Sequence, residues 1–238
     1  MSTDNLPDII AIDGPAASGK STIGLLLAQR LHYLCLDTGS MYRALALAAI
    51  RQGIRPENEE AIVDLAHACD LDIVPLAGET DGRQYTVLLE GEDVTWDIRL
   101  PEVDATVSQV STYPEVRMEM VRRQRIVGQR GKVVMIGRDI GTVVMPEAPL
   151  KLYVTATPEE RARRRLLDRR KQGHDDSFEV ILADVMRRDH IDGSRTHSPM
   201  RPAVDAIIID TTGRSVEEVL EEIMNLITGF RPEETIVE

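Results

Sequence analysis

The sequence predicts an α/β protein built on an open, mostly parallel five-stranded sheet with helices on both faces. Two observations lead to this fold class. Short apolar runs of strand length recur along the chain, at residues 9–13, 33–36, 133–136, 150–155 and 206–210. Turn residues or helical patterns follow each run. Because parallel strands need crossover connections of this kind, the alternation favours a parallel sheet.

The first two strand and helix pairs are the clearest. The run 9–13 ends at a glycine, and apolar residues then recur at helical spacing across 21–30. The run 33–36 is followed by an alanine-rich helical stretch at 41–51. We therefore expect strand, loop, helix, strand and helix in this part of the chain.

The segment 55–98 breaks this rhythm. It contains a helical piece at 62–69 and short strand-like runs at 71–75, 85–89 and 93–95. We interpret it as a small α+β insert in a core domain formed by residues 1–54 and 99–238. Two helices, at 101–111 and 114–129, lead back to the main sheet, each with a proline in its first turn.

Composition excludes several classes of protein. The chain has 238 residues with 42% hydrophobic content, enough for one core and an inserted subdomain. The net charge of -12 argues against a surface that grips nucleic acid. Cys35 and Cys69 form no CxxC pair, and no long apolar run follows a basic N-terminus. We expect a cytoplasmic monomer without a nucleic-acid or membrane partner.

The stretch GPAASGKST, between the first strand and the first helix, predicts a phosphate-binding loop of the P-loop NTPase type. Gly14 and Gly19 bracket four residues before Lys20 and Ser21, which is the spacing of that motif. Glycines let backbone N–H groups turn inward toward phosphate oxygens, and the helix start adds a positive end. The residues expected to bind ATP here are Gly14, Pro15, Ala16, Ala17, Ser18, Gly19, Lys20, Ser21 and Thr22.

Within that loop two side chains have specific predicted roles. Lys20 is expected to reach the β and γ phosphates, and the Ser21 hydroxyl to ligate Mg²⁺. Asp13, at the end of the preceding strand, is expected to be structural and to bond loop backbone. The chain has no Asn-Lys-x-Asp element, which argues against a guanine-specific switch protein.

If the phosphate acceptor is itself a phosphate, two anions must meet, and fixed positive charges are needed to offset their repulsion. No general base is needed, because a phosphate oxygen is already ionised. Charged residues that could bind such an acceptor follow the second and third predicted strands and precede the last one. They are Arg43, Arg138, Asp139, Arg188, Asp192 and Arg195.

An arginine-rich segment predicts a helical lid at about 157–176. Six of the ten residues in 161–170 are arginine, and such a helix can close over the donor phosphates. Arg161 and Arg164 are the expected ATP contacts. Asp168 is expected to form an i,i+4 contact with Arg164.

Five stretches together resemble bacterial cytidylate kinase, in order and at similar spacing over nearly the whole chain. They are GPAASGKST, DTGSMYR, SQVSTYPEVR with the later RRQR, GRDIGTVVMPEAP, and RDHIDGSR followed by SP. The resemblance implies transfer of the γ-phosphate of ATP to CMP or dCMP, with Mg²⁺ on the donor. It also implies that the insert is an enlarged nucleotide-monophosphate-binding domain.

The same resemblance implies residue roles. Arg43, Arg138 and Arg188 resemble the clamps on the acceptor phosphate, and Lys20, Arg138, Arg188 and Asp139 are the expected catalytic set. The residues that resemble cytosine readers are Thr38, Arg117, Asp139 and Arg195. Ser108 and Asp192 resemble those near the sugar. Cytosine offers an amine donor beside acceptors, which a carboxylate and arginines can match.

One position departs from the family pattern. Relatives commonly have an acidic residue before the glycine of GRD, where it could hold magnesium or its waters, but this chain has Ile136. Asp139, Asp37 or Asp13 substitutes for it, or the metal relies on Ser21, phosphates and water.

Two alternatives to the cytidylate kinase hypothesis remain open from the sequence. One is a P-loop kinase for another monophosphate or for a hydroxyl acceptor, with Asp139 as the base. The other is a non-catalytic nucleotide or nucleic-acid binding module, which only the basic segment 161–170 supports.

Overall fold

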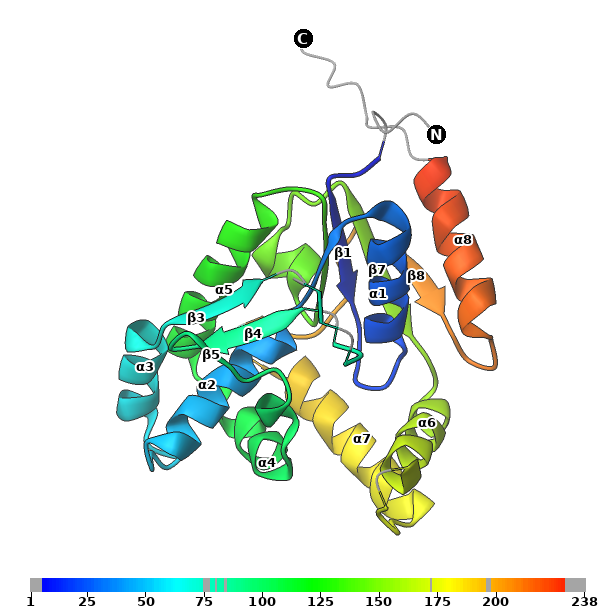
Figure 1. Cartoon of the computed structure of the whole chain (residues 1–238). Coiled ribbons are helices and arrows are strands. Elements are labelled where there is room, and N and C mark those ends of the chain that lie inside the picture. The colour runs from blue at the N-terminus through cyan, green and yellow to red at the C-terminus, as the bar shows by residue number, and fades with distance from the viewer. Residues whose placement is uncertain are drawn as a thin grey trace. The chain divides into compact units, whose positions relative to one another are not determined.

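The computed structural model of the chain describes residues 6–74, 78–79, 81–83, 85–171, 173–195 and 198–229 (Figure 1). A five-stranded sheet has the strand order β2-β6-β1-β7-β8. Its strands are β1 (Ile9–Asp13), β2 (Leu34–Asp37), β6 (Val133–Gly137), β7 (Leu150–Thr155) and β8 (Ile207–Asp210). All five lie where the apolar runs predicted strands.

The strands β6, β1, β7 and β8 pair in parallel, which confirms the predicted fold class. In the sheet register Ile12 of β1 lies between Ile136 of β6 and Leu152 of β7. All three side chains are buried. Strands covered on both faces need apolar residues at every position, which is why the sequence shows continuous runs and no alternation.

The chain divides into two compact units. The first comprises residues 1–33 and 131–238, and the second comprises residues 34–130. The predicted division into a core and an insert at 55–98 stays a prediction.

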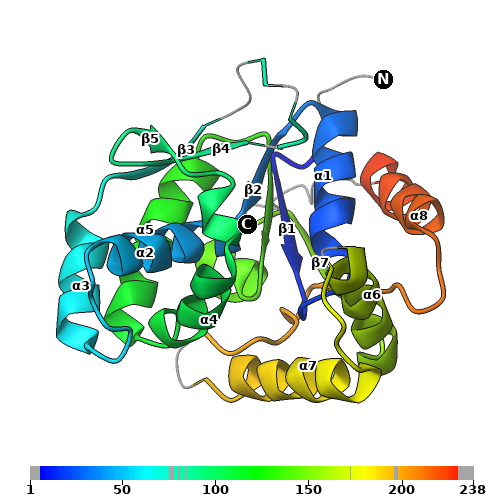
Figure 2. The same ribbon diagram turned by 60° about the horizontal axis from the view of Figure 1, so that its bottom comes forward.

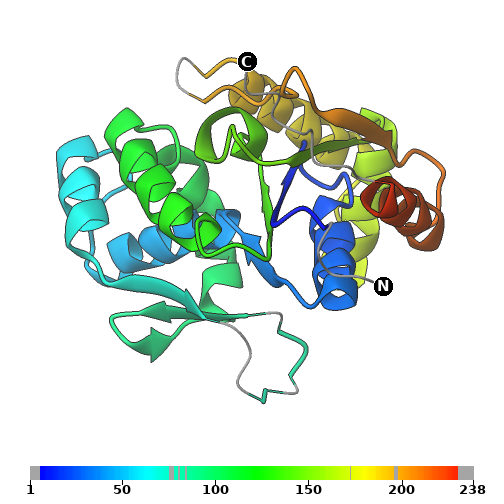
Figure 3. The ribbon, with the colours of Figure 1, turned by 90° about the horizontal axis from the view of Figure 1, so that it is seen from above.

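In the first unit, α1 (Lys20–Leu31) packs against β6 and β1. Gly24 makes this approach possible, because a Cβ there would lie 2.5 Å from Cδ1 of Ile136. Beside α1 lies α8 (Val216–Thr228), as Figures 1 and 3 show. A capping box of Ser215 and Glu218 starts α8.

The arginine-rich segment forms α6 (Pro158–Lys171), which lies alongside α7 (Phe178–Gly193) in Figure 2. A small apolar cluster holds the two helices together: Ala162 and Leu166 from α6 pack with Ile181 and Val185 from α7. The remaining faces of both helices are mostly polar, so this pair is stabilised by a narrow apolar seam.

The second unit contains a three-stranded sheet of β3 (Leu71–Val74), β4 (Thr86–Leu89) and β5 (Glu92–Asp93), with antiparallel pairing. Its helices are α2 (Gly39–Arg51), α3 (Glu59–Ala68), α4 (Pro101–Val110), α5 (Pro114–Gly128) and the short 3₁₀ helix η2 (Asp97–Arg99). The prediction of a strand at 93–95 is wrong in position, because β5 covers only Glu92–Asp93. The Asp93 carboxylate accepts hydrogen bonds from the Thr95 backbone and hydroxyl, which ends the strand in a turn.

None of the helices in the described part of the chain is long and apolar enough to cross a membrane.

Candidate active site

The loop from Gly14 to Thr22 connects β1 to α1 and depends on two glycines. Gly14 has a φ of +147°, and a Cβ there would lie 2.0 Å from the backbone oxygen of Val154. Gly19 has a φ of +92° at the start of α1. Only glycine fits such positions without strain. The Lys20 ammonium is buried and donates to the Pro15 carbonyl oxygen at 2.8 Å, so it lies within the loop.

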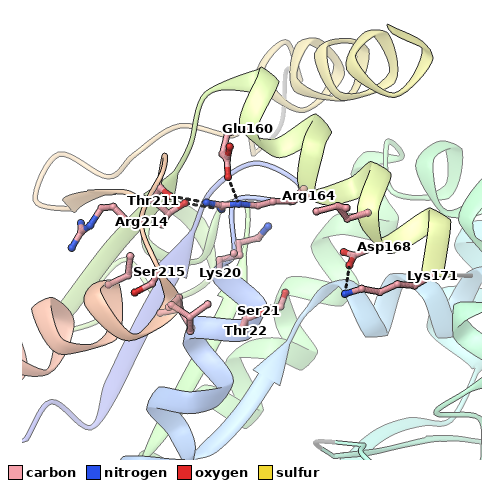
Figure 4. Close-up of a pocket in the computed structure, with 16 residues that line it drawn as sticks. Lys20, Ser21, Thr22, Glu160, Arg164, Asp168, Lys171, Thr211, Arg214 and Ser215 are labelled. Atoms are coloured by element: carbon pink, nitrogen blue, oxygen red, sulfur yellow. Dashed lines mark hydrogen bonds and ion pairs between the residues drawn. The ribbon is translucent and has the colours of Figure 1, made fainter. Parts of the chain in front are cut away.

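A pocket of about 430 Å³ lies against this loop, within the size range of small-molecule sites. Its walls come from the phosphate-binding loop and α1, from α6, and from the segment between β8 and α8 (Figure 4). The polar and charged lining residues are Lys20, Ser21, Thr22, Glu160, Arg164, Asp168, Lys171, Thr211, Arg214 and Ser215.

Arg164 joins α6 to this loop. Its Nη1 donates to the Thr211 hydroxyl at 2.9 Å, and its Nη2 to the Thr211 carbonyl at 2.7 Å. The Thr211 hydroxyl in turn donates to the Ser18 carbonyl of the loop at 3.0 Å. The predicted contact between Arg164 and Asp168 is wrong. Arg164 pairs with Glu160 at 3.0 Å, one turn in the other direction, as Figure 4 shows.

Arg161 has a different environment. Its side chain is only 3% exposed and forms a two-point ion pair with Asp189 of α7. Its Nε donates to the Ala156 carbonyl at 3.0 Å, and Nη1 to the Ala16 carbonyl of the loop at 3.3 Å. These bonds hold the first turn of α6 against the loop backbone. A direct contact between Arg161 and ATP stays a prediction.

Three predicted acceptor residues of the first unit lie together, although they are far apart in the sequence. The Asp192 carboxylate accepts from Arg138 Nε at 3.0 Å and pairs with Arg195 Nη2 at 2.6 Å. Arg188 precedes Asp192 by one turn of α7, and its Nε lies 3.4 Å from the Asp184 carboxylate. We call Arg138, Asp192 and Arg195 the acceptor cluster.

Asp13 and Asp139 lie at the carboxyl ends of β1 and β6, and both are buried. The Asp13 carboxylate accepts hydrogen bonds from the backbone N–H groups of Ile140 and Gly141, at 2.7 and 2.8 Å. Burial raises the pKa of Asp13 to about 6, the nearby Asp139 charge adds to this rise, and the two backbone donors and Lys20 oppose it. The predicted bonds from Asp13 to the phosphate-binding loop are therefore wrong: the carboxylate holds backbone that follows β6.

The second unit holds the remaining predicted residues. Thr38 is buried at the start of α2, and Arg43 in that helix pairs with Asp104 of α4 at 2.6 Å. Ser108 lies one turn further along α4. Arg117 of α5 is buried, donates to the Ser111 carbonyl at 3.2 Å, and lies over the ring of Tyr42, 5.5 Å from its centroid.

Sequence reasoning missed two of these neighbours. Tyr42 lies inside the DTGSMYR stretch, but the motif alone does not show that its ring supports Arg117. Asp104 has no sequence signal linking it to Arg43, because the contact depends on how α4 packs against α2. Since Arg43 belongs to the second unit and Arg138 and Arg188 to the first, their convergence stays a prediction.

A scan of family models matches the cytidylate kinase family over residues 10–229. The chain belongs to the cytidylate kinase family. The cytidylate kinase of Chloroflexus aggregans is 52% identical over 220 residues, which cover 92% of this chain and 94% of that protein. That of Roseiflexus castenholzii is 49% identical over 214 residues, covering 90% of each.

Among solved structures, an uncharacterized protein from Eubacterium ventriosum ATCC 27560 is similar with a TM-score of 0.50. It is 12% identical, and the match covers 93% of this chain and 98% of that one. This similarity concerns the fold alone.

Mg²⁺ is the metal that the resemblance to cytidylate kinases implies, and few side chains of this site fit it as ligands. The Ser21 hydroxyl lines the pocket and is the hard oxygen ligand that Mg²⁺ prefers. Ile136 is 1% exposed in the core, and both Asp13 oxygens accept backbone donors. Among the described residues no group of three or more His, Cys, Asp or Glu could hold a metal. The site therefore fits a metal bound by Ser21, nucleotide oxygens and water.

Proposed function

We propose that this protein transfers the γ-phosphate of ATP to CMP or dCMP, giving CDP or dCDP and ADP. The observation that carries the proposal is the match to the cytidylate kinase family over residues 10–229, a span that contains the phosphate-binding loop and the whole acceptor cluster. The pocket beside the loop supports ATP as the donor, because its size and its basic residues suit a nucleotide.

On the donor side, the loop from Gly14 to Thr22 binds the phosphates of ATP through its backbone and through Lys20. Lys20 exchanges its bond to the Pro15 carbonyl for phosphate oxygens. Arg164, held by Thr211 at the rim of the loop, adds positive charge. When bound, Mg²⁺ supplies charge neutralisation and orientation of the phosphates, with Ser21 as its protein ligand.

On the acceptor side, Arg43, Arg138 and Arg188 bind the phosphate of the monophosphate. Two unit charges 4 Å apart interact by about 4 kcal/mol near a protein surface. Several guanidinium groups are therefore needed to bring one phosphate against another. The acceptor oxygen is already ionised, so no side chain has to remove a proton.

Base and sugar recognition use the remaining predicted residues. Arg117, Arg195, Asp139 and Thr38 read cytosine, and Ser108 and Asp192 lie near the sugar. Arg117 is well placed to act as a rigid donor, since Tyr42 and the Ser111 carbonyl fix its guanidinium. We further infer a cytoplasmic monomer. It acts on free nucleotides and not on nucleic acid, because the net charge of -12 opposes binding to a polyanion.

The test is product analysis by ion-exchange chromatography after incubation of the purified protein with ATP, Mg²⁺ and one of CMP, dCMP, UMP or AMP. The proposal expects CDP and dCDP to form faster than the other diphosphates, each matched by one ADP. ADP formation only with UMP or AMP would overturn the choice of substrate. Binding of CMP without any diphosphate would overturn the enzymatic activity.

A further inference from the structure

Asp13 directly precedes the phosphate-binding loop, which we also call the donor loop. Its carboxylate, however, bonds to the segment that follows the predicted acceptor residues Arg138 and Asp139. Asp13 is the last residue of β1, directly before Gly14, and its side chain is 3% exposed. Both of its carboxylate oxygens accept backbone N–H groups, from Ile140 at 2.7 Å and from Gly141 at 2.8 Å. These two residues directly follow Arg138 and Asp139.

The short turn that carries Arg138 and Asp139 is therefore fixed at both ends on one residue. Before the turn, Gly137 of β6 lies in register with Asp13 in the sheet. After the turn, the chain comes back to the Asp13 carboxylate at the start of the π-helical segment η3 (Ile140–Val144). The first N–H groups of a helical segment have no intrahelical partner, and a carboxylate is a favourable acceptor for them.

Glycine at position 141 eases this close approach, because a side chain there would require Lys151 to shift. A Cβ at Gly141 would lie 3.1 Å from Cδ of Lys151 and 3.5 Å from the Asp13 oxygen. The Asp139 carbonyl accepts from Val143 and Val144, so the same segment also holds Asp139 from its other side. Arg138, in turn, reaches Asp192 in the acceptor cluster.

We propose that Asp13 is a positioning residue that fixes the Arg138 and Asp139 turn beside the donor loop, and so sets the geometry of the acceptor site. This inference rests on the proposed function, because Arg138 and Asp139 matter to turnover only if they bind the acceptor. It also gives the Asp13 carboxylate a role that does not depend on a metal, because each of its oxygens already accepts a backbone N–H group.

The substitution Asp13→Asn tests the proposal. The amide keeps the shape but places an NH₂ group against one of the two N–H donors, so one hydrogen bond is lost and the turn loosens. The expected result is a fall of about 10-fold or more in kcat/KM for CMP. The Kd for ATP alone, measured by calorimetry, should stay within about 2-fold, because the loop backbone is unchanged. Asp8→Asn, an exposed carboxylate at the other end of β1, is the control and should behave as the original protein.

A second measurement needs no variant. In the protein without nucleotides, the ¹H–¹⁵N resonance of Gly141 should titrate with the Asp13 carboxyl, whose pKa is about 6. The charged groups that act on the pKa of Asp13 are Asp139, which raises it, and Lys20, which lowers it. Asp13→Asn should abolish this titration, whereas a purely space-filling role for Asp13 would leave the Gly141 resonance independent of pH near 6.

Three outcomes overturn the proposal: no loss of kcat/KM for CMP in Asp13→Asn, an equal loss of ATP affinity, or amide resonances of Ile140 and Gly141 that Asp13→Asn leaves unchanged. If the unsubstituted protein forms no CDP, the proposed function fails. The two amide resonances then still decide whether Asp13 holds the turn.

Discussion

Arg161 of α6 and Asp189 of α7 form a buried two-point ion pair whose arginine also reaches the donor loop. The distance from Nη1 to Oδ1 is 2.9 Å, and Nη1 lies 3.3 Å from the Ala16 carbonyl. Asp189 directly follows Arg188, the proposed clamp on the acceptor phosphate. The pair thus links the helix that carries Arg188 to the backbone that binds ATP.

Asp189→Ala should lower both stability and ATP affinity, because it leaves the Arg161 charge buried without its partner. Breaking such a pair costs about 3 kcal/mol. Thermal unfolding and calorimetric titration with ATP check the two effects. Glu179→Ala removes an exposed carboxylate of the same helix, α7, that does not line the pocket, and it should change neither appreciably. Lower stability with unchanged ATP affinity would contradict the link to the loop.

Arg188→Ala should reduce turnover with CMP by about 100-fold or more, the typical effect of removing a group that stabilises transition-state charge. The Kd for ATP should change little, since this side chain serves the acceptor. Arg187→Ala is a matched control, because Arg187 pairs with the same Asp184 but is 57% exposed. Equal losses of turnover and ATP affinity in Arg188→Ala would contradict its placement.

Asp192→Ala should reduce kcat/KM more for CMP than for dCMP. Loss of the carboxylate frees both Arg138 and Arg195, which harms both substrates. The additional loss for CMP comes from the proposed contact with the 2′-hydroxyl, and one hydrogen bond to a charged group is worth about 1.5–3 kcal/mol. The ratio of the two kcat/KM values measures that contact, and an unchanged ratio would remove the assignment.

The stability that Glu119 contributes should depend on pH. Hydrogen bonds from Arg122, and then Arg123, lower the pKa of Glu119 to about 2 against the opposing effect of burial. A carboxyl with a lowered native pKa stabilises the fold above its unfolded value of 4.5, and this contribution is lost as the pH falls toward 2.

Glu119→Gln tests this dependence by thermal unfolding at pH 7, 4 and 3. Because Arg122 is exposed, solvent screening limits the expected contribution to about 1–2 kcal/mol, or about 2–8 °C in Tm at pH 7. The difference from the original protein should begin to shrink at pH 4 and fall to about half or less at pH 3, because the pKa of Glu119 in the folded protein is about 2. Glu92→Gln, at an exposed pair with Arg51, should have little effect at any pH. A difference that is as large at pH 3 as at pH 7 would show that packing, and not charge, is responsible.

Local sequence was sufficient for the five strands of the main sheet, because buried parallel strands produce continuous apolar runs. It was not sufficient where side chains redirect the backbone. The Asp93 carboxylate ends β5 early, and η3 depends on Asp13, which lies 127 residues before Ile140. Neither α7 nor α8 was anticipated. In α7 only Ile181 and Val185 are buried, so its apolar pattern is weak, whereas Ser215 and Glu218 did offer a start signal for α8.

For the candidate site, too, local sequence predicted the motifs but not the contacts that depend on tertiary packing. Motif spacing predicted the phosphate-binding loop, and the structure agrees with the glycine positions that it requires. Spacing could not show that Asp192 holds Arg138 and Arg195, since the partners of an ion pair depend on tertiary packing. It also placed Arg164 against Asp168, whereas the guanidinium turns toward Glu160 and the loop.

A crystal structure with CMP bound tests the central claim most directly, because the claim is that separate arginines bind one acceptor phosphate. The account predicts that guanidinium nitrogens of Arg43, Arg138 and Arg188 each lie about 3 Å from oxygens of the CMP phosphate. A CMP phosphate bound away from all three arginines would contradict it.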